Sequence, residues 1–103
     1  MIIVNTDFIS GKELETITMV KGSVIQAKHV GKDIMSGFKG LVGGELTAYS
    51  DMMNEARAKA TKRMVEEAQG LGADAVINVR YTSAAVMQGA AEILVYGTAV
   101  KFK

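Results

Sequence analysis

The stretch of sequence that decides the fold lies near the end of the chain and reads Ala91-Glu92-Ile93-Leu94-Val95-Tyr96-Gly97-Thr98-Ala99-Val100-Lys101-Phe102. Successive side chains of a β-strand point to opposite faces of its sheet, and here the odd-numbered and the even-numbered residues are both mainly apolar. One helix covers only one face of an antiparallel sheet, and the other face is normally polar. We therefore predict a strand over Ala91–Phe102 whose second apolar face is covered by another copy of the chain. The alternative is that a short helix and the 83–89 loop of the same chain cover it.

The residues before this stretch predict the other strands. Ala75–Thr82 reads as a strand with apolar odd positions, and a loop over Ser83–Gly89 follows it. Two strands this close in sequence form an antiparallel hairpin. Nearer the N-terminus, Ile2–Val4 predicts a short strand, and a β-branched run from Thr16 to Val30 predicts a longer one. Gly22 interrupts that run, which predicts a bulge or a bend.

One long helix is predicted from about Glu45 to Leu71. Its apolar residues recur every three or four positions, the period of a helix with one buried stripe; they are Tyr49, Met52, Met53, Ala56, Ala60, Met64, Ala68 and Leu71. Because alanines leave little side chain to bury, this helix must lie close to whatever it covers. Oppositely charged residues four apart are expected to pair on its exposed side; the pairs are Glu55–Lys59, Lys62–Glu66 and Arg63–Glu67. A short helix is also predicted from Ile34 to about Lys39, with Asp33 as its cap.

Composition limits the class of protein. The chain has 103 residues, a formal net charge of +1, 49% hydrophobic residues and no cysteine. This length fits one domain over residues 1–103. The balanced charge argues against binding to nucleic acid or to an anionic membrane through bulk charge, and the lack of cysteine excludes disulfides, thiolate metal sites and a cysteine nucleophile. The N-terminus lacks the pattern of a signal peptide, so we expect a cytoplasmic protein.

Five ordered motifs resemble those of the YbjQ-like family, a group of small bacterial and archaeal proteins labelled as heavy-metal-binding. They are Lys32-Asp33-Ile34, Gly43-Gly44-Glu45-Leu46, Ala56-Arg57 with Arg63-Met64, Gly72-Ala73-Asp74-Ala75-Val76 and Tyr96-Gly97-Thr98-Ala99-Val100. The resemblance implies an α+β fold, namely a two-layer β-α-β-β core with one long helix packed on an antiparallel sheet. It also implies assembly into a ring-like homopentamer. No established activity and no known cofactor come with it.

A metal site is the family's label, and the residue most suited to it is His29. Soft heavy metals prefer thiolate, thioether or imidazole ligands, but this chain has a single histidine and no cysteine. Its methionines at positions 52, 53 and 64 fall on the helix stripe, where methionine usually fills the core. His29 is therefore either a structural or solvated residue, or a ligand whose five copies converge on the axis of a ring, as Asp33 could also do.

A second candidate site surrounds the start of the long helix. Gly43, Gly44 and Glu45 stand where free backbone N–H groups favour anions, and Lys32 and Asp33 are candidates to lie nearby. The alternative is a tight turn in which Glu45 complements the helix dipole. Arg80, on the polar face of its strand, is either a salt-bridge partner between subunits or a clamp for a ligand.

The leading hypothesis is a non-enzymatic, cytoplasmic homo-oligomer that binds a small ligand or a metal ion. The first alternative is an enzyme whose site forms between subunits around Lys32, Asp33, Glu45 and Arg80. The second is a structural module that assembles with a partner protein. Neither a nucleophile–base pair nor a nucleotide-binding loop is evident in the sequence.

Overall fold

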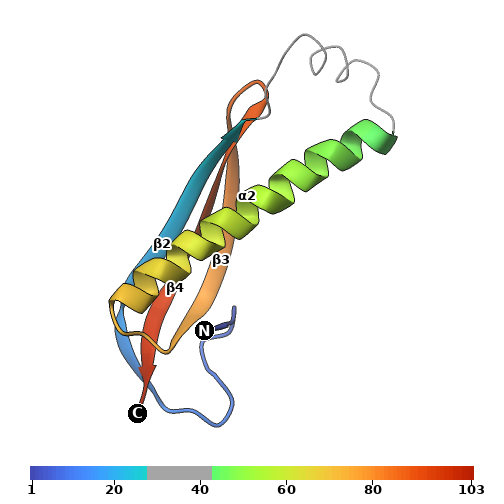
Figure 1. Cartoon of the computed structure of the whole chain (residues 1–103). Coiled ribbons are helices and arrows are strands. Elements are labelled where there is room, and N and C mark those ends of the chain that lie inside the picture. The colour runs from blue at the N-terminus through green and yellow to red at the C-terminus, as the bar shows by residue number, and fades with distance from the viewer. Residues whose placement is uncertain (28–42) are drawn as a thin grey trace.

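The computed structural model describes residues 1–27 and 43–103, with backbone alone for residues 43–48. Its elements are β1 (Ile2–Ile3), β2 (Leu14–Ala27), α2 (Gly43–Gly70), β3 (Ala75–Met87) and β4 (Ala90–Phe102). The strands form one sheet in the order β1-β3-β4-β2, and α2 lies across one face of it (Figure 1). The predicted short helix Ile34–Lys39 and the predicted end of the long strand at Val30 lie outside the described residues.

The sheet is mixed, whereas the sequence predicted an antiparallel one. β4 pairs antiparallel with both β2 and β3, but β1 pairs parallel with β3, with Ile2 opposite Ala75. A parallel neighbour requires a long crossover, and here the crossover contains β2 and α2. The predicted two-layer α+β arrangement, with one helix on a sheet, is confirmed.

The hairpin is longer than predicted. β3 continues to Met87, and the turn between β3 and β4 contains only Gln88 and Gly89, whose φ is 80°. Alanine has only a weak preference for strands. Pairing with β4, in which Ala85 lies opposite Ala91, nevertheless holds the end of β3 in an extended conformation. The predicted loop over 83–89 was therefore wrong, and it cannot cover the second face of the sheet.

The main core lies between α2 and the sheet. The predicted helix stripe is buried at Met52, Ala56, Ala60, Met64 and Ala68, whereas Leu71 lies beyond the helix end and is exposed. Four of them, Ala56, Ala60, Met64 and Ala68, belong to one core cluster with Val20 and Val24 of β2 and with Ile93, Val95 and Ala99 of β4.

Gly22 lets α2 come close to β2. A Cβ atom on Gly22 would overlap the carbonyl oxygen of Ala60 and lie 2.5 Å from the backbone nitrogen of Met64. Gly22 itself pairs regularly with Val95, and the irregularity of β2 falls between Thr16 and Thr18 instead. The bulge predicted at Gly22 was therefore wrong. The close approach of the helix is confirmed.

The second face of the sheet is covered only in part. Near the chain termini, Ala75, Ile77 and Val100 are buried beneath Val4, Ile9, Leu14 and Phe102, so the N-terminal segment covers this end. Residues of β2 alternate between the two faces, and Val20 and Val24 face the helix, so Met19 and Ile25 face away. Both are exposed, by 66% and 63%, and Tyr96 of β4 is exposed as well. This end of the second face is open in a single chain.

No helix among the described residues is both long enough and apolar enough to span a membrane.

Candidate functional site

Most of the residues predicted for a site fall where side chains are not described. His29, Lys32 and Asp33 lie outside the described residues. Gly43, Gly44 and Glu45 form the first turn of α2, which begins at Gly43, two residues before its predicted start. Their backbone N–H groups therefore stand at the positive end of the helix.

Arg80 is engaged with the protein's own backbone. Its Nη1 donates hydrogen bonds to the carbonyl oxygen of Asn5, at 2.9 Å, and to that of Val79, at 3.0 Å. The bond to Asn5 ties the N-terminal segment to β3 across 75 positions of sequence. The structure thus gives Arg80 an intramolecular role that was not among the predicted alternatives.

A bulge next to Arg80 changes the direction in which β3 presents its side chains. Asn78 has a φ of 53°, a left-handed conformation that asparagine tolerates better than most residues. The pairing of β3 with β4 shifts between Ile77 and Arg80. Beyond the shift Tyr81 faces the helix, where its hydroxyl shares a hydrogen bond of 2.8 Å with that of Thr61.

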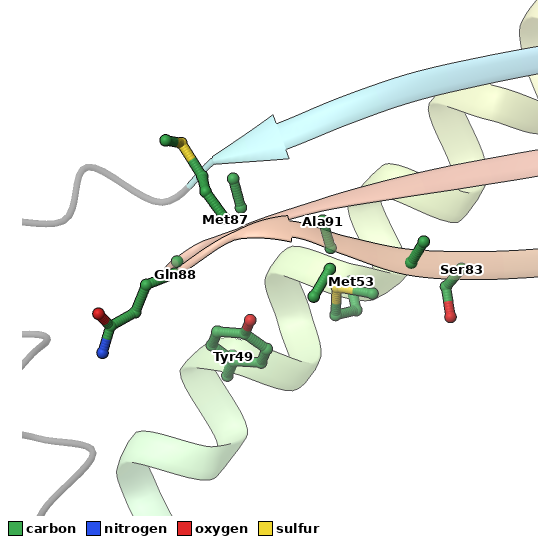
Figure 2. Close-up of a pocket in the computed structure, with 10 residues that line it drawn as sticks. Tyr49, Met53, Ser83, Met87, Gln88 and Ala91 are labelled. Atoms are coloured by element: carbon green, nitrogen blue, oxygen red, sulfur yellow. The ribbon is translucent and has the colours of Figure 1, made fainter.

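A pocket of about 230 Å³ lies between the N-terminal half of α2 and the tip of the β3–β4 hairpin (Figure 2). Tyr49 and Met53, one helical turn apart, come to it from α2. The other lining residues belong to the hairpin and are mostly small; they are Ser83, Ala84, Ala85, Met87, Gln88, Gly89, Ala90 and Ala91. Figure 1 shows α2 diverging from the strands toward its N-terminal end. Small side chains do not fill the space that this divergence leaves.

The described residues that line the pocket are electrically neutral. Among them there is no aspartate, glutamate, lysine, arginine or histidine. Its polar groups are the hydroxyls of Tyr49 and Ser83 and the amide of Gln88, against a background of alanine methyls and the Met53 thioether. A ligand that suits such a lining is itself small, neutral and largely apolar. These described residues offer no pair of groups for acid–base or nucleophilic catalysis.

The described residues do not fit a heavy-metal site. They contain no group of three or more histidine, cysteine, aspartate or glutamate side chains that could hold a metal ion. Met53 and Met87 both line the pocket, but Figure 2 shows Met87 pointing away from the helix that carries Met53. A soft metal needs several thioethers converging on one point, and these two do not converge.

Sequence reasoning missed the pocket because it treated 83–89 as a loop. A signal was present in the composition: the residues from Tyr81 to Ala91 include no charged residue and no proline. Once this run is extended and paired, its small side chains lie opposite the first apolar residues of the helix stripe. The space between these two sets of side chains depends on the angle between α2 and the strands, and the sequence pattern does not predict that angle.

Comparison with known proteins gives the chain relatives over its whole length. A family model described as "Putative heavy-metal-binding", that of YbjQ, matches residues 1–103. A "UPF0145 protein" of Alkaliphilus metalliredigens is 81% identical over 102 residues, covering 99% of each chain. One of Methanosarcina acetivorans is 65% identical, covering 98% of this chain and 96% of its own.

One solved structure supports the fold. The crystal structure of a Pediococcus pentosaceus protein of unknown function, from the DUF74 family, matches with a TM-score of 0.73 and 16% sequence identity. The match covers 100% of this chain and 98% of the other. At this identity the similarity shows the shared α+β architecture.

Proposed function

The chain belongs to the YbjQ family, whose description names heavy-metal binding but no reaction, and on this premise we propose that it is a non-enzymatic, cytoplasmic homo-oligomer that binds a small, neutral ligand. The ligand lies in the pocket between α2 and the β3–β4 hairpin. A ring of five copies is the assembly that the family resemblance implies.

The observation that carries this proposal is the neutrality of the described residues that line the pocket. At about 230 Å³ the space is smaller than the usual small-molecule site, whose volume is at least roughly 300 Å³. The ligand is therefore small. Two hydroxyls and one amide are enough to orient one or two polar groups on it.

The shape of the chain supports the homo-oligomer. Its radius of gyration is 17.0 Å and its extents are 55 × 22 × 16 Å, whereas a compact domain of about 100 residues has a radius of gyration of about 13 Å. An elongated chain buries less of its own surface than a compact chain of the same length, and association with other copies would supply the missing burial.

A heavy metal is not the ligand we propose, because the described donors do not fit one. Elemental analysis of protein purified without a histidine tag tests this point. We expect no copper or zinc in a fixed ratio to protein. A stoichiometric metal that is lost in His29→Ala would contradict this part of the proposal and favour a cluster of His29 copies on a ring axis.

Binding of N-phenyl-1-naphthylamine, a neutral apolar fluorophore, tests the pocket. At about 0.3 kcal/mol per non-hydrogen atom, a probe of this size binds with a Kd on the order of 0.1 mM. Ala85→Phe places a ring in the pocket and is expected to weaken binding at least 10-fold.

The matched control is Ala58→Phe, which makes the same change at an exposed position of α2 on the side opposite the buried Ala56 and Ala60. It should leave binding unchanged, and native mass spectrometry should show the same subunit number for both variants. Equal binding by wild type and Ala85→Phe would contradict the pocket as the ligand site.

A further inference from the structure

The side chains of β3 that face α2 form a row that continues past the pocket. Residues that lie opposite each other on paired strands have their side chains on the same face of the sheet. Tyr81 lies opposite Val95, and Ser83 lies opposite Ile93. Both of these β4 residues belong to the core cluster beneath α2, so Tyr81 and Ser83 face α2 as well. Ser83 lines the pocket, and Tyr81 is the next side chain of the row.

A row of side chains on α2 meets the row on β3. Residues four positions apart lie on the same side of a helix, and Tyr49 and Met53, which line the pocket, share a side with Thr61. Thr61 lies about 12 Å further along α2 than Met53, and Tyr81 lies about 7 Å from Ser83 along β3. The two rows meet where the hydroxyls of Thr61 and Tyr81 share a hydrogen bond of 2.8 Å. From this bond toward the pocket, α2 and the strands diverge (Figure 1).

The hydrogen bond between Thr61 and Tyr81 has a defined direction. The Thr61 hydroxyl has a single proton, which it donates to the carbonyl oxygen of Arg57 at 2.7 Å. The Tyr81 hydroxyl is therefore the donor, and Thr61 Oγ1 is the acceptor. The bond to Arg57 also holds the Thr61 side chain against the helix backbone. Tyr81 thus bonds to an acceptor whose position moves only with α2 itself.

Hydrogen bonds hold α2 on both sides of the same short segment. On the β2 side, Arg63 and Glu67 bond to the strand backbone, and on the β3 side Thr61 bonds to Tyr81. The pocket lies between β3 and the part of α2 that precedes this segment. The distance between helix and hairpin at the pocket therefore depends on the bond between Thr61 and Tyr81.

The size of the pocket gives this bond a consequence for ligands. At about 230 Å³ the pocket is small, and a ligand that exceeds this space enters only if α2 moves away from the hairpin. A hydrogen bond weakens steeply as its geometry is distorted, so the bond between Thr61 and Tyr81 opposes that movement. A ligand that fits the existing space leaves the bond intact.

We propose that Thr61 and Tyr81 determine the specificity of the pocket, because their hydrogen bond holds α2 near β3 and so favours small neutral ligands, of about the size of indole, over larger ones. This rests on the proposed function and specifies which ligands of that class the pocket selects. Neither residue is among the described residues that line the pocket. Both are therefore positioning residues that act through the placement of α2.

Binding of two neutral probes of different size to the full chain tests this proposal. N-phenyl-1-naphthylamine is the larger probe and is followed by its fluorescence, and indole is the smaller probe and is measured by competition. Tyr81→Phe removes the donor of the bond, and Thr61→Val removes the acceptor at nearly unchanged shape. Each variant should bind the larger probe about 2- to 10-fold more tightly than the wild type, which corresponds to one hydrogen bond, and indole within about 2-fold of it.

The double variant and two controls separate specificity from stability. Because both substitutions remove the same bond, the double variant Tyr81→Phe, Thr61→Val should show the change of one single variant and not the sum. Thr61→Ser keeps the hydroxyl and should keep the wild-type ratio of the two dissociation constants. Val100→Ala removes methyl groups from the core on the other face of the sheet. It should lower the free energy of unfolding without changing that ratio.

An unchanged ratio in Tyr81→Phe or in Thr61→Val, with native circular dichroism, would overturn this proposal and leave the pocket as the ligand site. If one of the two variants fails to fold, the other decides. An equal change of the ratio in Val100→Ala would assign the effect to general loosening and would also overturn the proposal. Failure of the wild type to bind either probe would overturn the proposed function itself.

Discussion

Gly22 and Arg80 show what single residues contribute to this fold. Gly22 allows two backbones to approach more closely than any side chain would permit, and Arg80 ties the N-terminal segment to β3 through the carbonyl of Asn5. Sequence reasoning singled out both residues but gave them other roles. Each role depends on a neighbour at least 38 positions away, Ala60 for Gly22 and Asn5 for Arg80, and local patterns carry no information about such contacts.

Gly22→Ala tests the close approach of α2 to β2. The added methyl would overlap backbone atoms of Ala60 and Met64, which cannot rotate away, so the helix must shift. We expect the free energy of unfolding to fall by about 1–3 kcal/mol, the usual range for overpacking, in urea denaturation monitored by circular dichroism.

Gly70→Ala is the matched control for this substitution. Gly70 is the last residue of α2, and a Cβ atom added to it would meet no other atom within 4 Å. The free energy of unfolding of this variant should differ from that of the wild type by no more than about 0.5 kcal/mol. Equal losses in the two variants would mean that the space at Gly22 does not limit the distance between helix and sheet.

At the scale of elements, α2 was the most predictable part of the molecule and the β3–β4 hairpin the least. A stripe with a helical period records which side of α2 is buried, and five of its members are buried as predicted. The end of β3 consists of small residues without a strong preference for strand, so only pairing with β4 extends it. The parallel pairing of β1 could not be predicted either, because a strand of two residues is too short to show a pattern of alternating burial.

The contacts between α2 and the edge of β2 lead to a prediction about pairs of charges. Arg63 and Glu67 were expected to pair with each other, but each bonds to the β2 backbone instead. The double variant Arg63→Ala, Glu67→Ala exposes the β2 edge and removes two hydrogen bonds to charged groups. We expect its free energy of unfolding to fall by about 1–3 kcal/mol and light scattering on heating to increase.

The control for that variant is Glu55→Ala, Lys59→Ala. These residues form the predicted ion pair on α2, with 3.2 Å between Lys59 Nζ and Glu55 Oε1, and both side chains are about half exposed. An exposed pair of this kind contributes about 0–1 kcal/mol. If the control lost as much stability as the Arg63, Glu67 variant, the contacts with the β2 edge would have no special effect.

For the whole molecule, the described elements of a single copy leave part of the second face of the sheet uncovered. One half of the second face is covered by the N-terminal segment, and the other half presents Met19, Ile25 and Tyr96 to solvent. The pocket lies toward the same end of the sheet as Ile25, which pairs with Glu92 of β4. The sequence indicated this incompleteness through the two apolar faces of β4, but it did not locate the pocket, because the pocket results from the unpredicted length of β3.

The subunit number is the measurement that tests this account most directly. Native mass spectrometry of the untagged protein at micromolar concentration should give a mass that is a multiple of 11.0 kDa, with five copies as the expected number. A single species of 11.0 kDa under these conditions, with the fold intact by circular dichroism, would contradict the claim that other copies of the chain complete this structure.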